Sequence, residues 1–298
     1  MKLSQLPASL NLNILRDGEF TLLGKATTAY LEGQIALSYL TELKYLEGMA
    51  ANPHIGCVIV KDEFLDQVHV PHWGLISAKD PKLAFTHIHN ALAQTDFYWP
   101  DFATIIDPSA IIMDGAWIAP RGVKIGKHCL VEPLAVIHRG SILHDHVIIR
   151  SGAQIGTAGF EFYHDGSAIH PVTTAGRAVL HDHVEIQHGT CVDRGMYGGD
   201  TILYPHVKVD NMVHVAHDVV VGERTCVVVG VVLGGRTVVG KDCWIGPNAV
   251  VSNGLTVGDN ATVSLGAIVT KNVADGQTVS GNFAIDHAKF LQFIKSIR

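Results

Sequence analysis

The most constraining feature of this sequence is an aliphatic residue at every sixth position, without interruption, from Leu203 to Val269. A glycine follows several of these residues, as at Gly222, Gly234 and Gly240. No α-helix has a period of six, whereas three short strands per turn give a parallel β-helix with a coil of about 18 residues. Successive coils lie about 4.8 Å apart, so residues one coil apart in the sequence become neighbours in space.

Composition indicates a folded, water-soluble protein of one or two domains. Of its 298 residues 47% are hydrophobic and 17% charged, which favours a packed core over disorder. The net charge is −6 and there is no block of Lys and Arg, so we expect no nucleic-acid partner. Five cysteines without a CxxC pair indicate reduced core residues in a cytoplasmic protein. We expect neither a signal peptide nor a transmembrane segment.

Three regions differ in pattern. Residues 1–100 lack the period of six, and a buried strand at Ile55–Val60 and a helix opening at Asp80-Pro81 predict a small α/β domain. Residues 101–280 carry the repeat and predict the β-helix domain. Residues 281–298 end in an amphipathic C-terminal α-helix, which either covers the last coil or contacts another subunit.

Two stretches interrupt the repeat, at about 157–178 and 193–202. Both contain turn-forming pairs, Asp165-Gly166 in the first and Gly198-Gly199 in the second. We therefore expect two loops that project from the coils. Loops held by a rigid scaffold are frequent locations of binding and catalytic residues.

His217 is the histidine that the repeat places most informatively. It lies two residues after Val215, a repeat position, and therefore at a turn between two faces of the coil. Counting one coil forward leads to Gly235, whose backbone N–H is open to an incoming group. A histidine base and an N–H that binds an oxyanion are what acyl transfer needs. On spacing alone, a structural role for His217 in its turn remains an alternative.

Several segments together resemble one enzyme family. The hexapeptide repeat is similar to that of a large acyltransferase superfamily, whose members fold as left-handed β-helices and are usually trimers. The closer resemblance, over nearly the whole chain, is to the UDP-3-O-(3-hydroxyacyl)glucosamine N-acyltransferases of lipid A synthesis. It rests on Ala36–Leu40 with Lys44-Tyr45, Gly56–Val60, Asp80–Phe85, Ile155-Gly156 with Gly159–Phe162 and Asp165-Gly166, Asp193–Gly195 with Asp200-Thr201, and Val209–His217.

This resemblance implies a reaction and the residues that perform it. His217 corresponds to the catalytic base and Gly235 to the glycine of the oxyanion hole. A homotrimer would transfer a 3-hydroxyacyl chain, carried on the 4′-phosphopantetheine of acyl carrier protein, to the amine of a UDP-linked glucosamine. The resemblance implies no metal and no bound cofactor. The substrate-binding residues that it implies are Tyr39, Tyr45, Asn211, Phe160 and Phe162.

Some of these assignments leave alternatives open. Tyr39 and Tyr45 would hold the uracil ring, since every nucleobase offers a face for stacking, but ordinary packing also explains two tyrosines. Phe160 and Phe162 would face the acceptor sugar or only clamp the first loop. The chain also departs from the family pattern at Glu42 and at Asn253-Gly254, where an asparagine and a second histidine are usual. Acyl length and the acceptor sugar are therefore left open.

Three other functions are compatible with parts of the sequence. A coenzyme A-dependent enzyme could transfer an acetyl or short acyl group to another nucleotide aminosugar. Trimeric β-helices also house zinc hydratases, for which His183 and His188, with His144 or His146, offer candidate ligands. A non-catalytic scaffold would leave His217 and the two loops without a purpose.

Overall fold

The structure is a computed structural model that describes residues 1–24, 32–281, 284 and 286–297. It divides into two compact units. The first comprises 1–101, 158–176 and 195–199, and the second comprises 102–157, 177–194 and 200–298. The two excursions from the repeat thus group with the N-terminal residues, whereas the sequence analysis assigned them to the β-helix domain.

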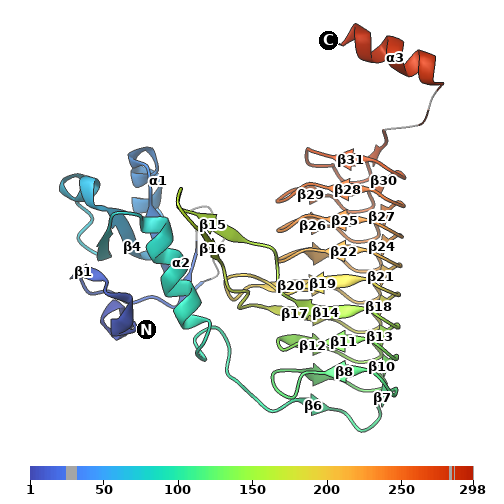
Figure 1. Ribbon diagram of the computed structural model, residues 1–298, viewed down its shortest axis with the longest axis horizontal. Coiled ribbons are helices and arrows are strands. Elements are labelled where there is room, and N and C mark those ends of the chain that lie inside the picture. The colour runs from blue at the N-terminus through green and yellow to red at the C-terminus, as the bar shows by residue number, and fades with distance from the viewer. Residues whose placement is uncertain (25–31, 282–283, 285, 298) are drawn as a thin grey trace. The chain divides into compact units, whose positions relative to one another are not determined.

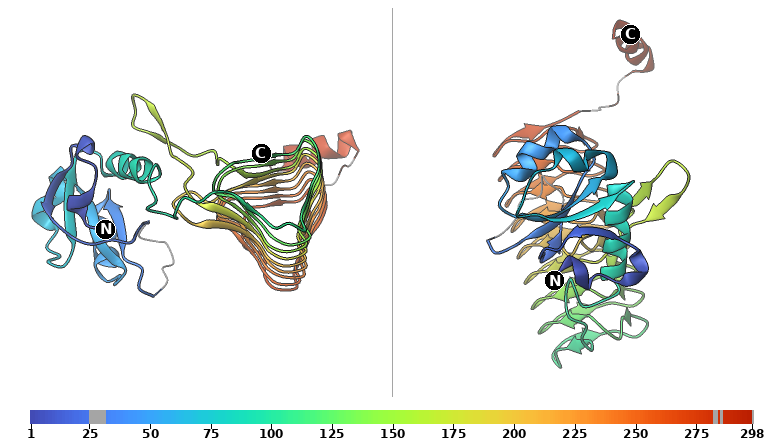
Figure 2. Two further views of the ribbon diagram at one scale, coloured as in Figure 1. Left: turned by 90° about the horizontal axis from the view of Figure 1, so that it is seen from below. Right: turned by 90° about the vertical axis from the view of Figure 1, so that its left-hand side faces the viewer.

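The second unit is a left-handed parallel β-helix, which confirms the predicted fold class. Its strands stack into three parallel sheets, and a view along the coil shows a three-sided cross-section (Figures 1 and 2). The first sheet contains β6 (Ile105–Ile106), β9 (Lys124–Ile125), β12 (Ser141–Leu143), β17 (Arg177–Leu180), β20 (Asp200–Leu203), β23 (Val220–Val221), β26 (Val238–Val239) and β29 (Thr256–Val257).

The other two sheets continue the same winding. The second contains β7 (Ile111–Ile112), β10 (Leu130–Val131), β13 (Ile148–Ile149), β18 (Glu185–Ile186), β21 (Lys208–Val209), β24 (Cys226–Val227), β27 (Trp244–Ile245), β30 (Thr262–Val263) and β32 (Thr278–Val279). The third contains β8 (Trp117–Ile118), β11 (Val136–Ile137), β14 (Gln154–Thr157), β19 (Cys191–Asp193), β22 (His214–Val215), β25 (Val232–Leu233), β28 (Val250–Val251) and β31 (Ile268–Val269).

The period-six residues form the core of the β-helix. Each ends its short strand and points inward, and its partner in the next coil is the corresponding residue, as in the pair Val215 and Leu233. All twelve repeat residues from Leu203 to Val269 are at most 6% exposed. A shift of one residue would turn each of them toward solvent, so the repeat sets the register of the whole column.

Three corners join the sheets, and each keeps one residue in the left-handed backbone region. At the first corner, between the first and second sheets, four successive coils place His128, His146, His183 and His206 there, with φ of 53°, 59°, 60° and 63°. Their rings stack with centroid separations of 5.0, 4.8 and 4.8 Å. These four histidines therefore form one continuous stack along the first corner.

Both excursions leave the coils at the third corner, between the third and first sheets. The first leaves after β14 and returns at β17, and the second leaves after β19 and returns at β20. The strands to which they return pair in register, with Arg177 opposite Asp200 and Leu180 opposite Leu203. The insertions therefore interrupt the period of six without disturbing the column.

The first unit is a five-stranded sheet packed on helix α2. The sheet order is β1-β5-β4-β3-β2, and apolar clusters cover both of its faces. Its elements are η1 (Leu3–Gln5), η2 (Ala8–Leu10), β1 (Asn13–Arg16), β2 (Leu22–Leu23), β3 (Ala36–Leu40), η3 (Leu43–Tyr45), α1 (Leu46–Ala50), β4 (Ile55–Lys61), η4 (Asp62–Gln67), β5 (Gly74–Ala78) and α2 (Pro81–Leu92). Asp80 caps α2 through Leu83 N–H, as predicted.

Helix α2 and the residues after it hold the first excursion. In that loop, β15 (Phe162–His164) and β16 (Ile169–Pro171) form a hairpin. His89 Nε2 donates to the Thr173 carbonyl at 2.6 Å, and Trp99 Nε1 donates to the Ala175 carbonyl at 2.9 Å. Within the hairpin, the Tyr163 hydroxyl donates to Asp80 Oδ2 at 2.6 Å. The loop is thus part of a packed unit.

His89 should make folding sensitive to acid. The side chain is fully buried, and burial lowers its pKa to about 4, below the 6.5 of an exposed histidine. Between pH 4 and pH 6.5, His89 therefore carries a proton in the unfolded chain but not in the folded chain. The stabilisation is complete above pH 6.5 and is lost as the pH falls toward 4, by roughly 3 kcal/mol in total. Chemical unfolding across this range measures the loss.

The variant His89→Gln keeps a donor toward Thr173 and removes the titration. Its unfolding free energy should fall less between pH 6.5 and 4 than that of the unaltered chain. His87→Gln, at an exposed position of the same helix, provides the matched control and should leave the pH dependence unchanged. Equal slopes for all three proteins would show that His89 does not contribute this acid sensitivity.

The C-terminal helix α3 (His287–Ser296) begins at Asp286, which caps it through the N–H groups of Ala288 and Lys289. None of its described residues is buried, so the interpretation of this helix as a lid over the last coil is not supported. Among the described residues, no helix is long and apolar enough to cross a membrane.

Candidate active site at the third corner

His217 lies at the third corner, in the turn between β22 and β23. One coil further on, Gly235 takes the same place between β25 and β26. The residues that follow them, Asp218 and Arg236, have φ of 58° and 63°, so the two turns repeat one geometry. Arg236 N–H donates to the His217 carbonyl at 2.9 Å, which joins the two turns. The spacing argument therefore brought together two residues that are neighbours in the fold.

Asp218 orients the His217 ring. Nδ1 of His217 lies 2.8 Å from Asp218 Oδ2, and the histidine is only 6% exposed. Because the carboxylate accepts, Nδ1 carries the proton in the neutral ring and Nε2 carries the lone pair. This arrangement leaves Nε2 as the basic atom. Asp218 was not among the predicted site residues, although its position directly after His217 made it a candidate.

Gly235 is required by the position of the imidazole. A Cβ atom built on Gly235 would lie 2.7 Å from His217 Nε2 and 2.8 Å from Cε1, so any side chain there would force the imidazole to move. The basic nitrogen thus faces the backbone of Gly235.

The amide of Gly235 differs from two amides at the first corner. At the first corner, Lys127 N–H and Lys241 N–H each donate to an aspartate one coil away, at 2.8 and 3.0 Å. Within the part of the chain that the structure describes, the N–H of Gly235 has no acceptor. A carbonyl oxygen of a substrate could therefore accept this hydrogen bond.

The two tyrosines predicted to bind uracil lie in the first unit and have different surroundings. Tyr39 is half-buried in β3, and its ring packs edge-on against Phe85 with centroids 5.0 Å apart. Burial and the nearby Glu161 carboxylate raise the pKa of Tyr39. Tyr45 ends η3 and is 49% exposed, with Lys44 Nζ 4.9 Å from its ring centroid. Among the described residues, no aromatic contact joins the two rings.

The remaining predicted residues occupy separate places. Phe160 is 89% and Phe162 48% exposed, and their rings meet edge-on with centroids 4.8 Å apart. Asn211 lies at the second corner, between the second and third sheets, and its Oδ1 accepts from His188 N–H at 3.1 Å. Within one chain, Asn211 is therefore at a different corner from His217.

Comparisons with known proteins agree with the hexapeptide pattern. A family model described as "Bacterial transferase hexapeptide (six repeats)" matches residues 122–157 and 236–271. A UDP-3-O-acylglucosamine N-acyltransferase from Bradyrhizobium sp. is 29% identical over 229 residues, which cover 66% of this chain and 63% of that protein. One from Helicobacter pylori (strain HPAG1) is 27% identical over 256 residues, covering 76% and 73%.

The chain therefore carries hexapeptide repeats and is similar to the UDP-3-O-acylglucosamine N-acyltransferases. The matched region is short in some relatives: a Caulobacter vibrioides protein of the same description is 41% identical over 107 residues, which are 29% of its length. A solved UDP-N-acetylglucosamine acyltransferase from Campylobacter jejuni aligns with a TM-score of 0.48 at 16% identity, covering 64% of this chain and 82% of that one.

The structure shows the surroundings of two residues at which the chain departs from the pattern of the family that it resembles. Glu42 forms an exposed ion pair with Lys44, with 2.6 Å between Oε2 and Nζ, so its charge is balanced locally. Asn253 lies at the third corner one coil beyond Gly235, where Gly254 N–H donates to the Gly235 carbonyl at 2.9 Å. A polar side chain therefore does follow the base at this corner.

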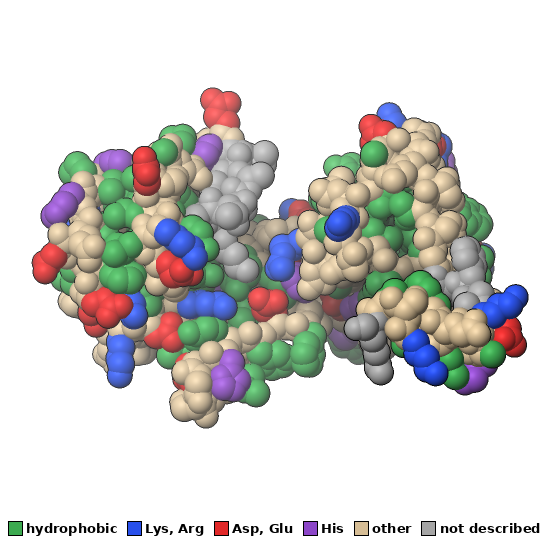
Figure 3. Space-filling model, turned by 90° about the horizontal axis from the view of Figure 1, so that it is seen from above, with side chains coloured by type: hydrophobic (Ala, Val, Ile, Leu, Met, Phe, Trp, Pro, Cys, Tyr) green, Lys and Arg blue, Asp and Glu red, His purple; other side chains and the backbone are tan. Residues whose placement is uncertain are grey.

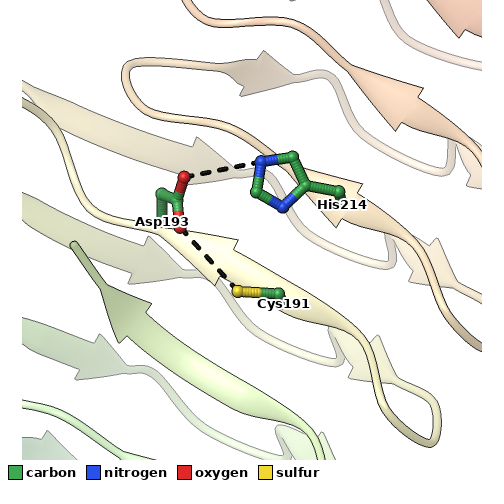
Figure 4. A group of neighbouring side chains, drawn as sticks. All are labelled: Cys191, Asp193 and His214. Atoms are coloured by element: carbon green, nitrogen blue, oxygen red, sulfur yellow. Dashed lines mark hydrogen bonds and ion pairs between the residues drawn. The ribbon is translucent and has the colours of Figure 1, made fainter. Parts of the chain in front are cut away.

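The zinc ligands considered for a hydratase are not brought together within this hexapeptide-repeat chain. His183 stacks between His146 and His206 at the first corner, whereas His188 lies at the second corner beside Asn211. Among the described residues, another group of side chains could hold a metal ion: Cys191, Asp193 and His214 (Figure 4). The sequence analysis did not find it, because the second excursion separates Cys191 from His214 by more than one coil length.

Proposed function

We propose that this protein is an N-acyltransferase that moves an acyl group from a carrier thioester to the amine of a UDP-linked glucosamine derivative. The observation that carries the proposal is the third corner, where the basic nitrogen of His217 faces Gly235 and Asp218 holds the other ring nitrogen. The relatives described as UDP-3-O-acylglucosamine N-acyltransferases support the choice of acceptor.

The proposed reaction uses groups of the chain itself. Nε2 of His217 removes a proton from the acceptor amine as its nitrogen attacks the thioester carbonyl. The Gly235 N–H donates to the oxygen that becomes negative in the tetrahedral intermediate. Collapse of the intermediate forms the amide and releases the thiol, which receives the proton from the imidazolium. Asp218 stabilises that imidazolium and keeps the ring in its productive orientation.

The donor and the assembly are parts of the same proposal. We infer a 3-hydroxyacyl chain on the phosphopantetheine of acyl carrier protein, in a cytoplasmic homotrimer. The outer face of the third sheet supports association because it exposes large apolar residues: Trp117 is 50%, Val232 38% and Ile268 63% exposed. Charges of both signs are interspersed on the face seen in Figure 3, which fits a small-molecule enzyme better than a nucleic-acid binder.

Uracil stacking gives a separate test of the nucleotide assignment. Exchanging Tyr39 and Tyr45 for alanine should weaken UDP binding, since a stacked base contributes about 1–3 kcal/mol. Calorimetry with UDP measures the change, and Tyr204→Ala is the control because that ring stacks on His181 in the β-helix. Unchanged UDP affinity in the Tyr39 and Tyr45 variants would place the uracil elsewhere.

The experiment that tests the proposed function is a donor and acceptor screen on the purified protein, with mass spectrometry of the product. Hydroxyacyl chains of graded length are offered on acyl carrier protein, and acetyl and short acyl groups on coenzyme A. UDP-linked glucosamines with a free amine are the acceptors. We expect an N-acylated nucleotide sugar from the carrier-protein donors. Product only from coenzyme A would favour the short-chain alternative, and no acyl transfer from any donor would contradict the proposal.

A further inference from the structure

Three side chains that can ligate a metal ion meet on the outer face of the third sheet. Cys191 of β19 is the register partner of His214 in β22, so both side chains project from the same side of the sheet. The residues beside them, Val192 and Val215, are fully buried in the core. Asp193 follows Cys191 by two positions, and Figure 4 shows its carboxylate between the thiol and the imidazole.

The separations between these groups are compatible with a shared ion: the imidazole–carboxylate contact is longer than a hydrogen bond, and the thiol–carboxylate contact is a long thiol hydrogen bond. Asp193 Oδ2 lies 3.6 Å from His214 Nε2, and Oδ1 lies 3.8 Å from Cys191 Sγ. One ligand atom from each residue can be chosen so that all lie within 4.8 Å of one another. A neutral nitrogen–oxygen hydrogen bond is about 2.9 Å long. Ligands bound tetrahedrally at about 2.0–2.3 Å from zinc are roughly 3.3–3.7 Å apart.

The surroundings hold the carboxylate in place and leave the site accessible. Thr157 of β14 donates its hydroxyl to Asp193 Oδ1 at 2.6 Å, and the same hydroxyl lies 3.0 Å from Cys191 Sγ. Asp193 is 4% exposed, whereas the His214 side chain is 44% exposed. A buried carboxylate fixed by a neighbour and an imidazole open to solvent are what a site that ions can enter requires.

We propose that Cys191, Asp193 and His214 bind a divalent metal ion of zinc type. A thiolate and a carboxylate balance the two positive charges of the ion, and thiolate with imidazole selects zinc over the harder magnesium and calcium. Three protein ligands leave a fourth position for water. This proposal does not depend on the proposed acyl transfer, and the ion takes no part in that reaction.

Cobalt(II), which occupies zinc sites and absorbs visible light, tests the proposal on the intact chain. Titration of the metal-free protein should produce a thiolate-to-cobalt band in the near ultraviolet at one equivalent, and zinc should abolish it. Cys191→Ser should remove the band. Thr157→Val, which leaves all three ligands in place, should weaken cobalt binding by about 10–100-fold.

Cys226→Ser is the matched control. Cys226 is also half-buried and projects from the outer face of a sheet, the second, where it pairs with Trp244. Its variant should keep the band and the affinity. The proposal is overturned if cobalt binds without a thiolate band, or if Cys191→Ser binds it as tightly as the unaltered chain. Thermal unfolding without metal checks that each variant is folded.

Discussion

Replacing His217 by alanine should lower the rate of acyl transfer by about 10²–10⁴-fold, the range over which a positioned general base contributes. The loss should appear in kcat, with little change in KM, because Nε2 acts on the amine as the bond forms. Folding should be retained, since the backbone carbonyl of His217 still accepts from Arg236 N–H. Steady-state kinetics with the donor and acceptor that the screen identifies measures the change.

Two further variants separate the base from a general effect of losing a histidine. His144→Ala removes an exposed imidazole at the first corner and should leave kcat unchanged. Asp218→Asn keeps the shape and tolerates the left-handed φ of 58°, but it supplies a weaker partner for Nδ1. It should lower kcat less than the loss of His217 does. Full activity in His217→Ala would remove this residue as the base.

Gly235→Ala should have the second largest effect, a fall in kcat of about 10²–10³-fold, comparable with the loss of one donor to an oxyanion. The added methyl group would lie 2.7 Å from His217 Nε2, so the ring must move away from its aspartate. It also occupies the space in front of the Gly235 amide. The backbone of Gly235 lies outside the left-handed region, so alanine itself introduces no strain there.

The Gly235→Ala variant should lose little unfolding free energy compared with its loss of catalytic rate. Overpacking of this kind costs about 1–3 kcal/mol, which thermal unfolding can detect without loss of the fold. Gly281→Ala is the control, because a Cβ there would meet no atom within 4 Å, and its rate should be unaltered. A Gly235→Ala protein with the kcat of the parent chain would contradict both the close approach and the oxyanion role.

Much of the β-helix could be predicted because its coils repeat. The period of six located the strands, their inward residues and the two excursions, and the count of one coil linked His217 to Gly235. Both residues lie in an uninterrupted part of the repeat, where distance in sequence translates directly into distance in space. The predicted strand at Ile55–Val60 and the cap at Asp80 were also confirmed, since both depend on local residues.

Features that depend on the excursions could not be predicted in this way. Cys191 and His214 are partners across two strands, but the second excursion lies between them and removes the regular count. The contact of His89 with Thr173 joins a helix of the first unit to a loop inserted in the β-helix, and no periodicity relates them. Sequence reasoning therefore located the corner of the proposed base, and it missed the polar contacts that an inserted loop brings together.

The stacking of His217 under Gly235 also restricts how this gene could change in length. The two residues meet because a single coil separates them, so one more coil inserted between them would carry the glycine a further strand spacing, about 4.8 Å, away from the imidazole. Whole coils could instead be gained or lost beyond Val257, and the two excursions show that extra residues can leave the column at a corner while the strands keep their register. Growth is thus tolerated at the end of the column and in projecting loops, while the interval between the base and its glycine must keep its length.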